Sequence, residues 1–201
     1  MPQDNRNYQT KRQLTDSLKK LMESKPLNKI SIREICEGCG VNRQTFYYHF
    51  EDIYDQVKWM FRDEIISVLK DFSHSSQWKE GLLILFRYIA DNRTVCLCTL
   101  NSLGHEHMKR FFVDDISTIV RNAIVYFAAK LPEHEIIKEY EDFLIKYYSS
   151  AIMGVLESWL LGEIEESPEQ MTGYICTIIE NQFYGTAART SSGSVPNPKE
   201  D

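Results

Sequence analysis

Six side chains that can hydrogen-bond to base edges or to phosphates occur within seven consecutive residues. They are Arg43, Gln44, Thr45, Tyr47, Tyr48 and His49. An arginine pairs well with guanine and a glutamine with adenine, whereas hydroxyl groups and histidine donate readily to phosphate oxygens. Two apolar residues, Phe46 and Phe50, interrupt the set at the spacing of one helical turn. The pattern predicts a short helix with one buried face and one face that reads DNA.

The segment before this short helix predicts a second helix and a tight turn. Ser31 and Glu34 stand three residues apart at the start of an apolar-periodic run, which is the spacing of a capping box. Gly40 suits the exit from that helix, because glycine adopts the left-handed conformation at low cost. Asn42 suits the start of the next helix. Residues 31–50 therefore predict a helix-turn-helix whose second helix enters a groove of DNA.

Cysteines offer a different chemistry. Cys36 and Cys39 are spaced like half of a zinc site or a redox pair, but no matching second pair accompanies them. Cys96 and Cys98 precede two histidines, at positions 105 and 107, so a metal site or a reactive thiol is an alternative there. Side chains two residues apart on a helix diverge, however. We expect neither a metal nor a cofactor.

The charge is distributed unevenly along the chain. The 201 residues carry a net charge of −6, yet residues 5–49 hold nine Lys and Arg against four Asp and Glu, which gives +5 for that end and −11 for the remainder. A basic end on an acidic body is typical of a protein that touches phosphates with one end only. The polar N-terminus shows no signal peptide, and no apolar run is long enough for a membrane span, so we expect a cytoplasmic protein.

Helical periodicity dominates the rest of the chain, and no stretch alternates with the period of a strand. The fold class expected is all-α, with a three-helix DNA-binding head and a helical-bundle regulatory body. The expected domains are 1–50 for an N-terminal arm and the helix-turn-helix, 51–184 for effector binding and dimerisation, and 185–201 for a disordered tail. Besides the two helices of the helix-turn-helix, the expected helices are 8–24, 51–73, 78–90, 94–103, 106–131, 135–162 and 168–184.

Two C-terminal helices have the composition of a dimer interface. Residues 136–161 are apolar over more than one face, and small residues recur every four positions, which lets another helix approach closely. Burial on two sides of a helix in a small domain favours a homodimer. The expected interface residues are Tyr147, Ala151, Gly154, Val155, Trp159, Ile175, Ile178 and Phe183.

Residues 10–60 resemble the DNA-binding domain of TetR-type bacterial regulators. The matching segments are Ile30–Ile35, Gly40–Val41 and Thr45–Phe50. The resemblance implies a homodimer of about nine helices per chain, whose paired recognition helices bind successive major grooves of a palindromic operator. It also implies an effector-binding body, and it adds Arg33 to the predicted DNA-binding residues. One departure is Ile53, where many members carry a lysine that contacts phosphate.

The sequence thus predicts a transcriptional regulator and not an enzyme, since no catalytic motif is present. Its partners are a double-stranded DNA operator, a second copy of the chain and an effector. One alternative is a small molecule that relieves repression from a pocket near Phe86, Phe112, Tyr126 and Tyr147. The other is a coactivator protein, because residues 45–59 and 154–171 resemble activators of dihydroxyacetone kinase operons. Thiol or metal sensing through Cys96 and Cys98 is a third possible mode of control.

Overall fold

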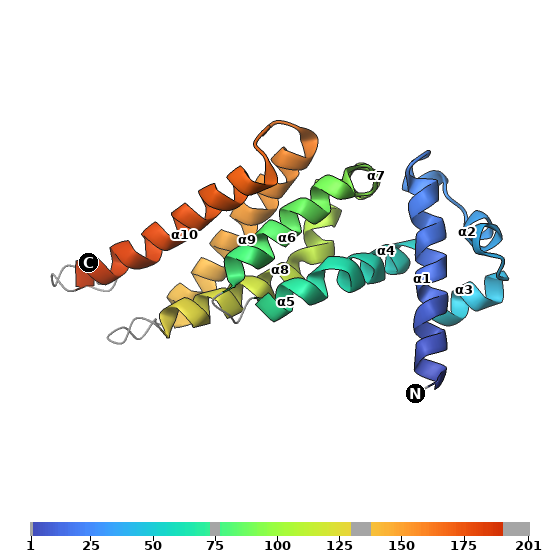
Figure 1. The fold of residues 1–201 in the computed structure, drawn as a ribbon, viewed down its shortest axis with the longest axis horizontal. Helices are drawn as coiled ribbons and strands as arrows, with labels where there is room; N and C mark the ends of the chain where they lie inside the picture. The colour runs from blue at the N-terminus through green and yellow to red at the C-terminus, as the bar shows by residue number, and fades with distance from the viewer. Residues whose placement is uncertain (1, 73–76, 130–137, 191–201) are drawn as a thin grey trace.

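The DNA-binding head predicted from the sequence forms one end of the molecule (Figure 1). The computed structural model describes residues 2–72, 77–129 and 138–190, and every regular element within them is helical. The head comprises α1 (Pro2–Met22), the 3₁₀ turn η1 (Leu27–Lys29), α2 (Ile32–Cys39) and α3 (Arg43–His49). In Figure 1, α1 lies across the end of the body, and α2 and α3 lie on its outer side.

One continuous rod joins the head to the body. It consists of α4 (Ile53–Phe61), a π-helical turn η2 (Arg62–Ile66) and α5 (Ser67–Phe72). At the end of η2 the Ser67 N–H donates to the Arg62 carbonyl, five residues back, instead of four. Such a wide turn inserts an extra residue into the helix and changes which side chains face its neighbours. Counted with this rod as one, the described residues form nine helices besides η1, as the sequence predicted.

The body is a bundle of five further helices. These are α6 (Trp78–Asp91), α7 (Arg93–Leu103), α8 (His105–Ala128), α9 (Lys138–Leu161) and α10 (Pro168–Thr190). Helix α10 packs along α6, and α8 packs along α9. The C-terminal end of α10 lies at the far end of the bundle from the head (Figure 1). Among the described residues, no helix is long and apolar enough to cross a membrane.

The hydrophobic core does not stop at the boundary between head and body. One cluster of buried side chains begins with Leu14 and Leu18 of α1, includes Phe46 of α3 and Val57 of α4, and extends to Leu160 of α9. A three-helix head alone buries little apolar surface and would be marginally stable. Its packing against α4 and α7 supplies the rest, so the core continues across the expected boundary at residue 50.

Two helices extend beyond their expected ends. Helix α1 begins at Pro2, where the sequence predicted a loose arm before residue 8, and α10 continues to Thr190, past the expected start of the tail at 185. Proline is well tolerated in the first turn of a helix. Extending a formed helix costs little compared with nucleating one, so the residues after 184 follow α10. The rest of the predicted tail, 191–201, lies outside the described residues.

Candidate nucleic-acid interface

Local hydrogen bonds fix the helix-turn-helix in the way the sequence predicted. The Ser31 hydroxyl accepts from the Glu34 N–H at 3.4 Å, and the Glu34 carboxylate accepts from the Ser31 N–H at 3.0 Å, which completes the capping box. Hydrogen bonds from Lys25 and then from Ser31 lower the pKa of Glu34 to about 2. Gly40 lies in the left-handed region with φ of 71°, and Asn42 Oδ1 accepts from the Thr45 N–H at 2.8 Å.

Helix α3 separates a buried face from an exposed one. Phe46 is fully buried and Phe50 nearly so. By contrast, the side chains of Tyr47 and Tyr48 are 60% and 77% exposed, although large aromatic side chains are normally buried at least in part. Arg43 and Gln44 are exposed at the N-terminal end of the same helix. These four side chains form one outward surface at the end of the molecule, which we call the α3 surface.

The other three predicted DNA-binding residues, Thr45, Arg33 and His49, are engaged by neighbouring groups of the chain itself. The Thr45 hydroxyl donates to Asn42 Oδ1 at 3.1 Å, so it takes part in the cap. Arg33, on α2, donates from Nε to Glu37 at 2.6 Å, and both side chains are more than half exposed. His49 is half-buried, and burial followed by repulsion from Lys11 lowers its pKa. A neutral imidazole can donate one N–H to a phosphate but adds no positive charge.

Lys11 is a basic residue near this surface that was absent from the predicted set. Its ammonium group on α1 lies 5.3 Å from the ring centroid of Phe50 and 5.4 Å from that of Trp59. An ammonium held over aromatic rings keeps its charge near a defined position. The sequence shows only a lysine on the polar side of the first helix. Its position beside α3 depends on how α1 packs, which periodicity alone does not reveal.

The N-terminus of α4, which in many family members carries a lysine, is acidic here. Asp52 Oδ1 accepts from the Asp55 N–H at 2.8 Å, and Asp55 Oδ2 accepts from the Glu51 N–H at 3.2 Å. Ile53 is half-buried and packs against the core. The free N–H groups that would attract a phosphate at a helix N-terminus are therefore partly occupied by carboxylates, which repel phosphate.

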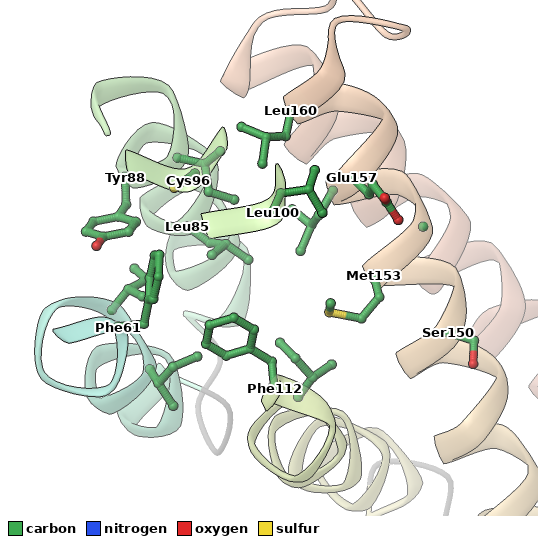
Figure 2. Close-up of a pocket in the computed structure, with 16 residues that line it drawn as sticks. Phe61, Leu85, Tyr88, Cys96, Leu100, Phe112, Ser150, Met153, Glu157 and Leu160 are labelled. Carbon is green, nitrogen blue, oxygen red and sulfur yellow. The ribbon is translucent and has the colours of Figure 1, made fainter. Parts of the chain in front are cut away.

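The body contains an apolar cavity of about 330 Å³ beside the connecting rod (Figure 2). Its walls come from the rod and from α6, α7, α8 and α9. The lining side chains are mainly apolar and comprise Phe61, Ile65, Ile66, Leu85, Tyr88, Ile89, Cys96, Leu100, Phe112, Ile116, Ser150, Met153, Gly154, Leu156, Glu157 and Leu160. The volume and lining suit a small apolar ligand.

Of the four residues predicted to form an effector pocket, only Phe112 lines this cavity. Phe86 is fully buried and packs edge-on against Trp159, with 5.1 Å between ring centroids. Tyr126 lies fourteen residues beyond Phe112 on the same helix, which displaces it by about 21 Å along the axis. Tyr147 is 57% exposed on α9. The sequence identified helices that form the cavity but not the positions along them.

The seven predicted dimer-interface residues whose side chains are described fall into three groups. Four are exposed, namely Tyr147, Ala151, Gly154 and Ile178, and two are half-buried, Val155 and Ile175. Trp159 instead belongs to the chain's own core, because it packs on Phe86 and its indole N–H donates to the Glu166 carbonyl at 2.7 Å. The side chain of Phe183 lies outside the described residues. Three further aromatic side chains of α9 and α10 that were not predicted are exposed by 47–58%, namely Tyr140, Phe143 and Tyr174.

The cysteine environments disfavour a thiol sensor. Burial raises the pKa of Cys96 to about 12, and burial also raises the pKa of Cys98, Cys36 and Cys39. A thiol with a raised pKa is protonated at neutral pH and is a poor nucleophile. Within the described side chains no group of three or more Cys, His, Asp or Glu is placed to hold a metal. The side chains of residues 105 and 107 lie outside that description.

A helix-turn-helix presented at one end of an all-helical body is the architecture of a DNA-binding regulator. Residues 14–55 match the family described as bacterial regulatory proteins, tetR family, and residues 76–181 match the one described as transcriptional regulator C-terminal region. The chain therefore belongs to the TetR family of bacterial transcriptional regulators. Members of this family are generally regulators and not enzymes.

Two proteins that are similar to this chain are both described as the operon activator DhaS. The chain is 30% identical over 84 residues to the HTH-type dhaKLM operon transcriptional activator DhaS of Lactococcus lactis subsp. lactis (strain IL1403). That match covers 42% of this chain and 45% of the activator, so it spans less than half the length of that relative. The structure of a dihydroxyacetone kinase operon activator DhaS superposes with a TM-score of 0.70 at 22% identity, covering 87% of this chain and 96% of the other. The likeness shows a shared fold.

Proposed function

We propose that this regulator binds a palindromic DNA operator as a homodimer through the α3 surface. The observation that carries the proposal is the exposure of Arg43, Gln44, Tyr47 and Tyr48 on a helix whose Phe46 is fully buried. The N-terminal residues of a recognition helix lie nearest the base edges, so Arg43 and Gln44 would contact bases. Tyr47 and His49 would bind phosphates and Tyr48 either group, whereas Thr45 would bind phosphate after its hydroxyl separates from Asn42. Arg33 would bind DNA only after separating from Glu37.

A single copy would bind DNA weakly. Helix α3 has only seven residues, and a helix this short reaches few base pairs. Pairing two copies through α9 and α10 would place two α3 helices in successive major grooves, about 34–36 Å apart. The exposed apolar side chains of α9 and α10 support this pairing, because soluble monomers rarely expose large contiguous apolar patches. Residues 1–50 would then bind DNA and residues 51–184 would serve dimerisation and effector control, in the cytoplasm.

Two modes of control follow from two observations. The partial similarity to a dhaKLM operon activator supports activation of a dihydroxyacetone kinase operon. In this mode the effector would be a coactivator protein. The apolar cavity supports the second mode, in which a small molecule bound in the body relieves repression. Both modes require the body to favour one arrangement of the two heads, and the effector to shift that population.

Selection of binding sites from a pool of random DNA duplexes tests the proposal. The purified protein should enrich an inverted repeat with half-sites about one helical turn apart. The logarithm of the association constant for the enriched duplex should fall steeply and linearly with the logarithm of salt concentration, because binding to phosphates releases counterions. Enrichment of a sequence without twofold symmetry would contradict the palindrome, and the absence of any enriched sequence would contradict DNA reading by this chain.

Ile178→Asp tests the proposed dimer interface. Ile178 is 61% exposed on α10, so the substitution should leave the monomer folded. Within an interface the new carboxylate would be buried without a partner, which costs roughly 3–5 kcal/mol, so the dimer dissociation constant should rise at least about a hundredfold. Sedimentation equilibrium measures the change.

Val125→Asp is the matched control for this substitution. Val125 is 54% exposed, but it lies on α8, outside the predicted interface. This variant should dimerise like the parent chain. Equal dissociation constants for the two variants would place the interface elsewhere or show that the chain is monomeric.

A further inference from the structure

The rim of the cavity is connected to the DNA-binding head through one carboxylate. Tyr88 of α6 lines the cavity, and Figure 2 shows its hydroxyl directed away from the cavity centre. That hydroxyl donates to Glu64 Oε2 at 2.7 Å. Glu64 also accepts from Lys19 Nζ of α1, at 2.9 Å to Oε2 and 3.2 Å to Oε1. Three groups from three elements therefore form one chain, which we call the Tyr88–Glu64–Lys19 link.

Glu64 is largely buried, so losing one of these hydrogen bonds would be costly. Its side chain is only 10% exposed, so water replaces a lost partner poorly. Arg12 of α1 adds a weaker contact at 3.5 Å, and Lys19 also donates to Asn92 Oδ1 at 2.9 Å, at the end of α6. The carboxylate is thus held on one side by the head and on the other by the cavity wall. A buried hydrogen-bonded charge fixes its partners in position more strongly than an exposed pair does.

The position of Glu64 in the connecting rod explains why it can serve both sides. It lies within the π turn η2, where the helix is widened by one residue. Its neighbour Asp63 also faces α1, since it accepts from Arg12 at 3.1 Å and from the Tyr8 hydroxyl at 3.1 Å. Among the described residues, only Glu64 of these two carboxylates accepts a hydrogen bond from the cavity wall. The π turn therefore presents two adjacent carboxylates to α1, and one of them also contacts Tyr88.

We propose that Glu64 is a positioning residue that reports occupancy of the cavity to the DNA-binding head, with Tyr88 as its contact on the cavity side and Lys19 as its contact on α1. An occupant that displaces the Tyr88 ring removes the hydroxyl from Glu64. The carboxylate then interacts with the cations of α1 alone, and the preferred position of α1, on which α2 and α3 pack, changes with it. The inference rests on the proposed function and names the residues through which the body regulates the head.

A tethered occupant tests the link without knowledge of the natural effector. Met153 projects from α9 into the cavity (Figure 2), so Met153→Trp places an indole there. We expect this substitution to speed amide hydrogen exchange in α1 and to weaken binding of the selected duplex, each about tenfold, within the range usual for coupled sites. In a Tyr88→Phe background, which keeps the ring but lacks the hydroxyl, the same substitution should change either quantity less than twofold.

Tyr8→Phe is the matched control. It also removes a tyrosine hydroxyl that donates to a carboxylate of the π turn, but Tyr8 does not line the cavity. The tenfold effect of Met153→Trp should persist in this background. Glu64→Gln, which keeps the shape of the side chain, should abolish the effect as Tyr88→Phe does. A role in stability alone would lower the melting temperature in all backgrounds without changing the response to the tethered indole.

Three outcomes would overturn the inference. These are an equal effect of Met153→Trp with and without the Tyr88 hydroxyl, no effect of Met153→Trp in any background, and loss of the effect in Tyr8→Phe. If circular dichroism shows that Met153→Trp is misfolded, Leu100→Phe fills the same cavity from α7 and replaces it. Amide exchange in α1 is measured without DNA, so failure to find an operator would contradict the proposed function and leave the test of the link intact.

Discussion

A chain carrying both Arg43→Ala and Tyr47→Ala is expected to bind the selected duplex at least about a hundredfold more weakly than the parent chain. A well-placed arginine contact with guanine contributes roughly 1–3 kcal/mol of discrimination, and a lost phosphate contact adds to it. Both side chains are exposed, so the free energy of unfolding should remain within about 0.5 kcal/mol of the parent value. Fluorescence anisotropy at one fixed salt concentration measures the affinity, and urea denaturation measures the stability.

Arg87→Ala serves as the control for charge. Arg87 is an exposed arginine of α6 that pairs with Glu169, in the body and away from the α3 surface. Its removal takes one positive charge from the chain, as Arg43→Ala does, but at a site away from DNA, and it should therefore weaken binding less than threefold. Unchanged affinity in the double variant would show that α3 is not the DNA-reading element, whatever the family resemblance implies.

Phe46→Ala is expected to have the largest effect on stability. The Phe46 side chain is fully buried in the core cluster that also includes residues of α1 and α4, and its ring centroid lies 5.7 Å from that of Phe50. Truncating a buried phenylalanine to alanine costs about 3–5 kcal/mol, through lost burial and the cavity left behind. Because native domains are stable by only about 5–15 kcal/mol, the head should be partly unfolded and DNA binding lost. Urea denaturation followed by circular dichroism measures the loss.

Tyr48→Ala, two residues further along the same helix, is the comparison for this substitution. Tyr48 is 77% exposed, so its removal should change the free energy of unfolding by no more than about 0.5 kcal/mol. The contrast between the two positions tests the orientation of α3. If Tyr48→Ala proved the more destabilising, the helix would be rotated relative to the described structure, and the α3 surface would be wrong.

The sequence predicted the head in detail because its signals are local. A capping box at Ser31 and Glu34, a left-handed Gly40 and an Asn42 cap each act within four residues, and the structure confirms all three. The alternation of Phe46 with polar neighbours fixed which face of α3 is buried. Helix-capping interactions and periodicity depend on the chain itself more than on distant packing, so they can be recognised without a structure.

The cavity could not be predicted in the same way. Which residues line it depends on the positions of α8 and α9 along the rod. Apolar residues on those two helices face both the cavity and the core. Phe86 illustrates the difficulty, because Leu85 and Tyr88 line the cavity while Phe86 points to Trp159. The π turn could not be predicted from the sequence either, since no residue type indicates it. Lys11 and Glu64 gain their roles from contacts with residues more than twenty positions away.

The continuous core limits how this regulator can be recombined with its relatives. A chimera joined at residue 50 would pair the foreign head with Val57, Met60 and Phe61, which pack in the same cluster as Leu14 and Leu18. The Leu27 N–H also donates to the Ser102 hydroxyl at 3.2 Å, so α7 contacts this head directly as well. A transplanted head would therefore need matching α4 and α7 segments. In evolution, new operator specificity should arise more readily by substitution on the exposed face of α3 than by exchange of whole heads.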